Sequence, residues 1–413
     1  MIRKVHTLSL RSGVLQLTLG ISLVIAMLSG SVILIVYYSK LSFLQQDLND
    51  RLRDHADSGI QYVMAAGPAI PYQEKQQMDL FGDQVDSVEI TRRPWGVFEL
   101  ATARAWRGAN HQFKAALIAP VPDDIGRSAL YVPNNHAALY MVGKAKIRGT
   151  AYASDRKFTS GYIDGHDFEG DRFVYGEIKQ SQSTLPVLDS ALLKAIEPVF
   201  SDLPGGYRLQ RQDRFPRGIY DFRSGDTGYY FSNQSIDIED SLQGNQIIHS
   251  AMRIRITARA VLQDVIVMAP EIDIEKGFRG SLQCFATRSI VVGEGSVLRY
   301  PSALVLMGDE QDSLIAISSG AKVNGIVVIR GIDQTVSSRS TFSLAKDAVL
   351  QGMAYVNAAA DIQGTLRGHI TAYTFQAKIK TAVYGGHIFN GVIDAVHRPP
   401  GLPATMLWAN KKE

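Results

Sequence analysis

The chain has 413 residues, of which 43 are Lys or Arg and 40 are Asp or Glu, so the net charge is +3. This length accommodates roughly two or three domains with a sizeable core. The balanced charge and the lack of a basic cluster argue against a nucleic-acid-binding protein. The single cysteine, Cys284, excludes an intrachain disulfide framework.

The first predicted element is a transmembrane signal anchor over residues 13–39, which contain no charged side chain. This stretch exceeds the roughly 20 residues that a helix needs to cross a bilayer, and it is longer than the apolar region of a cleavable signal peptide. Tyr37 and Tyr38 stand where an aromatic belt is expected. The alternative is a helix buried in the core of a soluble protein.

Residues 1–12 form a short basic segment without acidic residues, and such segments normally stay in the cytoplasm. Basic residues follow the span as well, but most of them lie farther from it. We therefore expect a single-pass protein of a bacterial inner membrane, with the N-terminus in the cytoplasm and the bulk of the chain outside it. Its first partner would be the lipid bilayer.

Ser22, Ala26 and Gly30 lie four residues apart, on one face of the anchor helix. Small residues at this spacing permit close packing of membrane helices, so these three are candidate helix-packing residues. The simpler interpretation is that small residues are common in membrane helices.

An amphipathic stalk helix is predicted over residues 40–66, because Leu44, Leu48, Leu52, Ala56 and Ile60 recur at intervals of four. Gly67 and Pro68 are typical of a helix end. An apolar helix that continues into an amphipathic one, after a short basic leader ending in Gly13, resembles the N-terminal helix of type IV pilins and pseudopilins. The resemblance implies a pilus-like or secretion-apparatus subunit. Thr18 occupies the position at which that family carries an acidic residue.

Residues 80–136 predict a small β-rich module. The segments 95–100 and 113–118 are typical of strands, and residues 108–110 of the turn between them. Trp95 and Trp106 are interpreted as core residues in preference to ligand platforms.

From residue 137 onward a five-residue pattern recurs, reading small, any, aliphatic, any, Gly or Asp. Ala321–Gly325, Ala348–Gly352, Ala360–Gly364 and Ala145–Gly149 are copies. Such repetition predicts a parallel β-solenoid, in which each coil buries its inner face only against its neighbours. The fold class is therefore mainly β, a β-solenoid with an N-terminal transmembrane helix and an α/β insertion.

The solenoid is predicted in two parts, with first coils over residues 137–178 and the main body over residues 246–395. Residues 260, 278 and 296 repeat at intervals of eighteen, near the length of one three-sided coil. Between the two parts, residues 179–245 predict an insertion with one helix at 189–200, which would form either a binding face or a packing flap. Residues 396–413 predict a tail that caps the open end.

The small-aliphatic-Gly pattern resembles the bactofilins and, more loosely, other right-handed β-helix proteins. The resemblance implies the β-helix fold and a structural role. The transmembrane helix, the stalk and the insertion depart from the compact bactofilin core.

No convincing catalytic site and no cofactor site emerges from the sequence. Asp164, Asp167, Glu169 and Asp171 are weak candidates for a metal site, since alternating carboxylates can bind a hard cation. A solvated corner explains them better. Arg253, Arg255 and Arg259 alternate along one predicted strand face and could meet an acidic polysaccharide, although any solvated strand shows the same spacing.

These features together indicate a membrane-anchored structural or interaction protein of the bacterial envelope, in preference to an enzyme. Its partners would be other envelope or pilus-like proteins, reached through the membrane helix and the 179–245 insertion. The alternatives are a carbohydrate-active β-helix enzyme and a membrane-tethered, bactofilin-like cytoplasmic scaffold.

Overall fold

A computed structural model provides the fold of the protein. It describes residues 12–72, 74–80, 82, 87–118, 124–155, 158–186, 209–223, 225–307, 312–330, 340–380 and 382–397. The chain divides into two compact units. The helical unit comprises Met1–Ala65, Lys75–Ile90 and Thr102–Lys114, and the stacked unit comprises Ala66–Glu74, Thr91–Ala101 and Ala115–Glu413.

One uninterrupted helix, α1 (Ser12–Ala66), covers the ranges predicted as anchor and stalk. It is long and apolar enough to cross a membrane, and its apolar window is not buried inside the protein. Its second half has a buried face formed by Leu52, Ala56, Ile60 and Val63. The predicted stripe at intervals of four therefore becomes a packing face from Leu52 onward. The short 3-10 helix η1 (Gly67–Ala69) follows directly after α1.

The buried face of α1 lies against a small sheet with the strand order β1-β2-β3-β4. Gly59 of α1 packs so closely that a Cβ there would lie 2.9 Å from the Cβ of Ala103 and 3.0 Å from Val88. An ion pair between Asp57 and Lys114 joins the helix to the last strand. The strands are β1 (Gln76–Met78), β2 (Ser87–Trp95), β3 (Phe98–Arg107) and β4 (Asn110–Ile118).

Two-residue turns connect β2 to β3 and β3 to β4. Each turn has a glycine with positive φ at its first position, Gly96 at +60° and Gly108 at +58°, as tight hairpins require. The predicted strand over residues 95–100 is therefore wrong, because the chain reverses at Gly96 and Val97. The turn predicted at residues 108–110 is confirmed.

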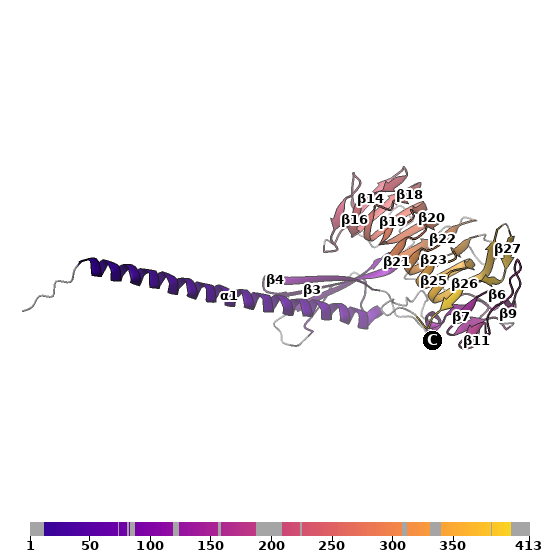
Figure 1. The fold of residues 1–413 in the computed structure, drawn as a ribbon, viewed down its shortest axis with the longest axis horizontal. Helices are drawn as coiled ribbons and strands as arrows, with labels where there is room; N and C mark the ends of the chain where they lie inside the picture. Colours follow the sequence, from indigo (N-terminus) through magenta and orange to yellow (C-terminus); the bar gives the residue numbers. More distant parts are fainter. Residues whose placement is uncertain are drawn as a thin grey trace, which may run out of the picture. The chain divides into compact units, whose positions relative to one another are not determined.

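Among the described residues, the stacked unit is built on a 22-stranded sheet, most of whose strands pair in parallel with strands of neighbouring turns; β27 pairs antiparallel with β26. The strand β19 (Val261–Ile274) illustrates the arrangement, since successive segments of it pair with β16, β17 and β18. Irregularities at Gln263/Val265 and Ala269/Glu271 bend the strand between these segments. The chain thus pairs along three successive segments here, and the sheet winds helically (Figure 1).

Aliphatic side chains stack in register along the interior of this sheet. One such ladder consists of Ile254, Ile272, Ile290, Ile315, Phe342 and Ala360. All six are at most 1% exposed, so each turn buries its apolar positions against the next. The first two steps are 18 residues long, which confirms the predicted repeat. The next steps are 25 and 27 residues long, because connections are inserted between the strands.

Stacked glycines explain the last position of the five-residue pattern. Gly325, Gly352 and Gly368 occupy equivalent places in three successive turns, with φ between +144° and +153°. A Cβ at any of them would collide with the carbonyl oxygen of the preceding turn. The copies at Ala348 and Ala360 lie on different faces, since Leu350 pairs with Val323 and Ala360 pairs with Phe342.

The order of the turns differs from the order of the sequence. The strand that pairs with β29 (Val392–Asp394) on its far side is β7 (Lys146–Arg148). The other edge of β7 pairs with β10 (Val174–Tyr175). The predicted first coils therefore lie beyond the C-terminal strands and not before residue 246. Figure 1 shows β7 and β11 next to β26, at the end away from β14 and β16.

The prediction of an insertion over residues 179–245 is also wrong for its second part. Residues 209–244 form strands of the parallel sheet, at the end of the stack opposite β10. The helix predicted at residues 189–200 lies outside the described residues, as does the tail from residue 398. The β-rich module ends earlier than predicted, since β5 (Leu130–Tyr131) already pairs with β26 and β8.

The remaining elements are short. A second helix, α2 (Asp124–Arg127), precedes β5, and a separate three-stranded sheet has the order β28-β6-β9. The bounds of the other strands are β6 (Leu139–Val142), β8 (Ala151–Ala153), β9 (Phe158–Ser160), β11 (Ile178–Gln180), β12 (Leu209–Arg211), β13 (Gly218–Tyr220), β14 (Thr227–Ser232), β15 (Ile236–Ile238), β16 (Ser241–Gly244), β17 (Gln246–Ser250), β18 (Arg253–Ile256), β20 (Arg279–Val292), β21 (Val297–Leu306), β22 (Leu314–Ile317), β23 (Lys322–Ile329), β24 (Thr341–Leu344), β25 (Val349–Ile362), β26 (Thr365–Ile379), β27 (Ala382–Gly385) and β28 (His387–Phe389).

Candidate functional site

One candidate site is an open polar pocket of about 260 Å³ on the small sheet of the helical unit. All four strands contribute to it, and the turn between β3 and β4 closes one side. Its lining residues are Gln77, Glu89, Arg104, Trp106, Gly108, Ala109 and His111.

The pocket lies on the face of the sheet that points away from α1. Side chains alternate along a strand, and Ala103 and Ala105 are fully buried on the helix side. Arg104 and Trp106 therefore point to the opposite side. Gln77 is the partner of Glu89 across β1 and β2. The two-residue turn at Gly108 sets Trp106 opposite His111.

Charge in the pocket is only partly compensated. The Glu89 carboxylate forms an ion pair with the Lys75 ammonium at 3.0 Å. Arg104, across the sheet from Glu89, has no hydrogen-bond or ion-pair partner among the described residues and is exposed. The pocket thus combines an uncompensated guanidinium, a half-buried indole ring and an amide. Such a set can bind a small anionic molecule with one apolar face.

A second structured feature is the tip of the β2–β3 hairpin, residues 91–101, which belongs to the stacked unit. Trp95, Val97, Phe98 and Leu100 join an apolar cluster on the outer surface of the parallel sheet, with residues such as Ile266 and Phe285. The indole N–H of Trp95 donates to the Asp264 carbonyl at 3.0 Å. Trp95 is thus a core residue, as predicted, whereas Trp106 lines the polar pocket.

The side chain of Gln283 fixes the turn of this tip. Its Oε1 accepts a hydrogen bond from the Val97 N–H at 2.9 Å, and its Nε2 donates to the Trp95 carbonyl at 2.9 Å. Arg93 donates to the Asn245 side chain at 3.1 Å. These hydrogen bonds satisfy buried backbone groups of the tip within the stacked unit, which is a structural role.

An ionic network centred on the buried Arg92 lies beside this tip. Arg92 is 5% exposed and pairs with the Glu99 carboxylate at 3.2 Å, while its guanidinium also donates to the Gly67 carbonyl. The Tyr72 hydroxyl donates to Glu99 at 2.7 Å, and Arg92 lies 4.4 Å from the Tyr72 ring centre. Burial, followed by the Glu99 carboxylate, raises the pKa of Tyr72 to about 12. The network is a structural clamp.

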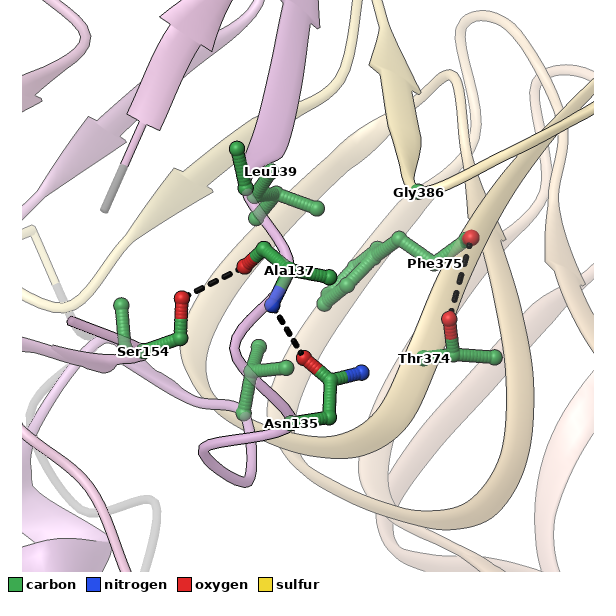
Figure 2. A pocket seen from close by; sticks show the side chains of 10 residues that line it. Asn135, Ala137, Leu139, Ser154, Thr374, Phe375 and Gly386 are labelled. Atoms are coloured by element: carbon green, nitrogen blue, oxygen red, sulfur yellow. Dashed lines mark hydrogen bonds between the residues drawn. The ribbon is translucent and has the colours of Figure 1, made fainter. Parts of the chain in front are cut away.

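A small crevice in the stacked unit, of about 40 Å³, is shown in Figure 2. The Asn135 Oδ1 accepts from the Ala137 N–H at 3.1 Å, and the Ser154 hydroxyl donates to the Ala137 carbonyl. Thr374 donates to the Phe375 carbonyl at 3.4 Å. This volume suits about one to three water molecules, and the polar groups serve the local backbone. We assign it a structural role.

Two groups that resemble catalytic machinery are closed to solvent. Ser128 Oγ lies 3.2 Å from His369 Nδ1, and His369 Nε2 lies 2.8 Å from Thr371 Oγ1. All three residues are at most 2% exposed, so no substrate reaches them. Cys284 is fully buried, and this burial raises the pKa of its thiol, which keeps it neutral.

The structure does not gather the weak metal candidates into a site. Asp164 lies 3.5 Å from Lys380, while Asp171 accepts a hydrogen bond from the Tyr175 hydroxyl. Among the described residues, no group of three or more His, Cys, Asp or Glu side chains is placed to hold a metal ion, so Asp167 and Glu169 join no such group. The candidate packing residues Ser22, Ala26 and Gly30 lie on the apolar half of α1, and their role stays a prediction.

Two of the three arginines that could have met an acidic polysaccharide, Arg253 and Arg255, are instead paired with carboxylates of the next turn. Arg253 contacts Asp273 at 2.5 Å, and Arg255 contacts Glu275. Since Asp237 stands beside Arg255 and Arg255 beside Asp273, opposite charges alternate along this face. Arg253 and Arg255 therefore neutralise their own sheet.

Sequence reasoning missed Gln77, Glu89, Arg104 and His111 as pocket residues. A signal was present for part of the set. The turn predicted at residues 108–110 places Trp106 and His111 across from each other, since two-residue hairpin turns fix the register of both strands. Comparisons of the chain with protein-family models, curated proteins and solved structures found no match.

Proposed function

We propose that the protein is a single-pass structural or interaction protein of a bacterial envelope. In this proposal α1 anchors the chain in the inner membrane, the N-terminus lies in the cytoplasm, and the winding parallel sheet is an extracytoplasmic β-solenoid. The single observation that carries the proposal is the division of α1 into an exposed apolar half and a half that is packed into a folded unit.

The apolar half has no covering surface among the described residues. Large side chains from Val14 to Leu44 remain about half exposed or more, with Leu15 at 63% and Phe43 at 69%. Each fully covered side chain of this kind is worth about 1.5–3 kcal/mol relative to water. A bilayer supplies that environment along the whole length, and Tyr37 and Tyr38 suit its interface.

The packed half of α1 belongs to a folded unit. Leu52, Ala56 and Ile60 are at most 6% exposed against the small sheet, and the Asp57–Lys114 ion pair fastens the same region. A helix that continues unbroken from a lipid-facing segment into such a packing face suits a pilin-like or secretion-apparatus subunit. Its lipid-facing half would then pack on equivalent helices through Ser22, Ala26 and Gly30.

The solenoid part of the proposal is supported by the stacked ladders and glycines of the parallel sheet. Each turn contacts mainly the turns before and after it, as in quasi-one-dimensional folds. A sheet stacked in this way presents an extended surface whose backbone is held by regular hydrogen bonds. A surface of this kind suits recognition or assembly of other envelope proteins, in contrast to a mobile catalytic cleft.

Fractionation and cysteine labelling test the anchor and its orientation. Because Cys284 is buried, the unchanged chain should not react with a membrane-impermeant maleimide and serves as the control. We expect the chain to stay with membranes in alkaline carbonate. Tyr162→Cys, at a residue that is 63% exposed, should react in cells with a permeabilised outer membrane, and Thr7→Cys only after lysis.

The opposite labelling pattern would replace this proposal with the cytoplasmic scaffold. Recovery of the chain in the soluble fraction would remove the anchor altogether.

Assembly through the small residues is tested by oxidative crosslinking in membranes. Ala26→Cys should form disulfide-linked dimers, whereas Leu28→Cys, about 200° around the helix, should not. Equal crosslinking of both variants would contradict a specific helix face.

A further inference from the structure

The polar pocket on the small sheet has the features of a ligand site that the structural role leaves unused. It faces away from α1, so its side chains do not contribute to the helix–sheet core. Its volume of about 260 Å³ lies just below the usual range for small-molecule sites, which indicates a ligand of about one ring.

We propose that this pocket binds an acidic saccharide, a pyranose ring that carries a carboxylate. The apolar face of the sugar stacks on the Trp106 ring, and the Arg104 guanidinium holds the carboxylate. Gln77 and His111 hydrogen-bond the ring hydroxyls.

Arg104 is the reason for proposing a negatively charged ligand. Its guanidinium is the uncompensated cation of the pocket, since the nearby Glu89 carboxylate is already neutralised by Lys75 at 3.0 Å. Guanidinium binds carboxylates through two parallel hydrogen bonds, which sets the orientation as well as the sign of the ligand. A neutral ligand would leave the exposed Arg104 guanidinium to water and would gain no charge-assisted contact.

Trp106 is the reason for proposing a ligand with a sugar ring. Its indole is half-buried and lines the pocket, so it offers a flat apolar face rimmed by hydrogen-bonding groups. A pyranose matches this arrangement, because it presents C–H groups on one face and hydroxyls around its edge. A simple carboxylate such as acetate uses Arg104 but leaves the indole face uncovered.

The test uses the full chain, labelled with 5-fluorotryptophan, in lipid nanodiscs free of sugar detergents. The chain has three tryptophans, and Trp106→Phe identifies the Trp106 fluorine signal. Methyl β-glucuronide is titrated against methyl β-glucoside, which has the same ring without the carboxylate, and against acetate. The fully buried Trp95 is the internal reference.

We expect a saturable shift of the Trp106 signal with the glucuronide, with Trp95 unchanged. The glucoside should bind about tenfold more weakly, as one charge-assisted contact implies. Arg104→Gln should abolish this preference, whereas the exposed Arg299→Gln, in the stacked unit, should keep it.

Three results would overturn the assignment. They are no Trp106 shift with the glucuronide, equal affinity for the glucuronide and the glucoside in the unchanged chain, or an acetate response as large as that of the glucuronide. The readout does not depend on membrane orientation, so it can fail while the structural role stands.

Discussion

Gln283 and Gly96 fit together so closely that the turn tolerates no side chain at the glycine. Any Cβ on Gly96 would collide with the Gln283 side-chain amide, which hydrogen-bonds the backbone on both sides of the turn. The positive φ of Gly96, +60°, imposes the same requirement independently. A close glycine–glutamine contact is therefore part of the packing of the hairpin tip on the parallel sheet.

Gln283→Ala should loosen this tip. The Val97 N–H and the Trp95 carbonyl would lose their partners in a buried place, at a cost of about 1–3 kcal/mol for each group. Hydrogen exchange of residues 91–101 should accelerate by an order of magnitude or more. Gln182→Ala, at an exposed position, should leave this exchange unchanged. Equal protection in both variants would show that the apolar cluster alone holds the tip.

Gly352→Ala should be far more destabilising than Gly385→Ala. The first adds a Cβ against the Gly325 carbonyl at φ +144°, whereas the second adds one in open space. We expect the free energy of unfolding to fall by more than about 2 kcal/mol for Gly352→Ala and by less than about 1 kcal/mol for the control. Thermal denaturation followed by circular dichroism measures both. Similar melting temperatures would contradict the stacked-glycine account.

Asp361 should make stability depend on pH. Burial raises the pKa of this carboxyl from its ordinary value to about 6, even though Gln363 donates to both of its oxygens at 3.2 Å. The folded state therefore favours the neutral acid. Stability should be highest below about pH 4 with respect to this group, fall as the pH rises to about 6, and stay constant above it.

The variant Asp361→Asn should remove this dependence and gain up to about 3 kcal/mol at pH 7.5 relative to the unchanged chain. Melting temperatures at pH 4.5 and 7.5 report the effect. The exposed Asp213→Asn serves as the control and should retain the pH dependence. If Asp361→Asn keeps the pH dependence of the unchanged chain, the carboxyl does not titrate as described.

Arg92→Met should cost about 3–5 kcal/mol, because it leaves the Glu99 carboxylate, whose side chain is only 16% exposed, without its cation. Arg288→Ala breaks an exposed ion pair with Glu271 and should cost no more than about 1 kcal/mol. The double variant Arg92→Met/Glu99→Gln should recover most of the loss, since no buried charge remains. Urea unfolding of the stacked unit compares the three. A loss in the double variant as large as in Arg92→Met would assign the cost to packing.

Local patterns in the sequence predicted the repeating parts of the fold. The interval of four residues marked the helix face that includes Leu52, and the interval of eighteen marked the ladder of Ile254, Ile272 and Ile290. Both follow from burial that repeats with the period of the backbone. The strand predicted across Gly96 failed because the alternation of side chains continues through a two-residue turn.

Local sequence patterns could not predict the order in which the turns stack or the residues that line the pocket. The pairing of Ile147 with Ile393 joins segments far apart in the sequence, and nothing local distinguishes it from a pairing with the next repeat. The pocket draws single residues from four strands, so no short motif contains it. Only Trp106 and His111 were linked by a turn that the sequence did predict.

The place of β7 beside β29 has a consequence for biogenesis. Residues 146–148 leave the ribosome long before residues 392–394, yet they complete their ladder only when those residues arrive. The edge of β7 that pairs with β29 therefore stays unpaired while the later strands are synthesised and fold. Folding of this end of the sheet therefore cannot finish before the last strands are synthesised, and chaperones that bind exposed strand edges should assist it.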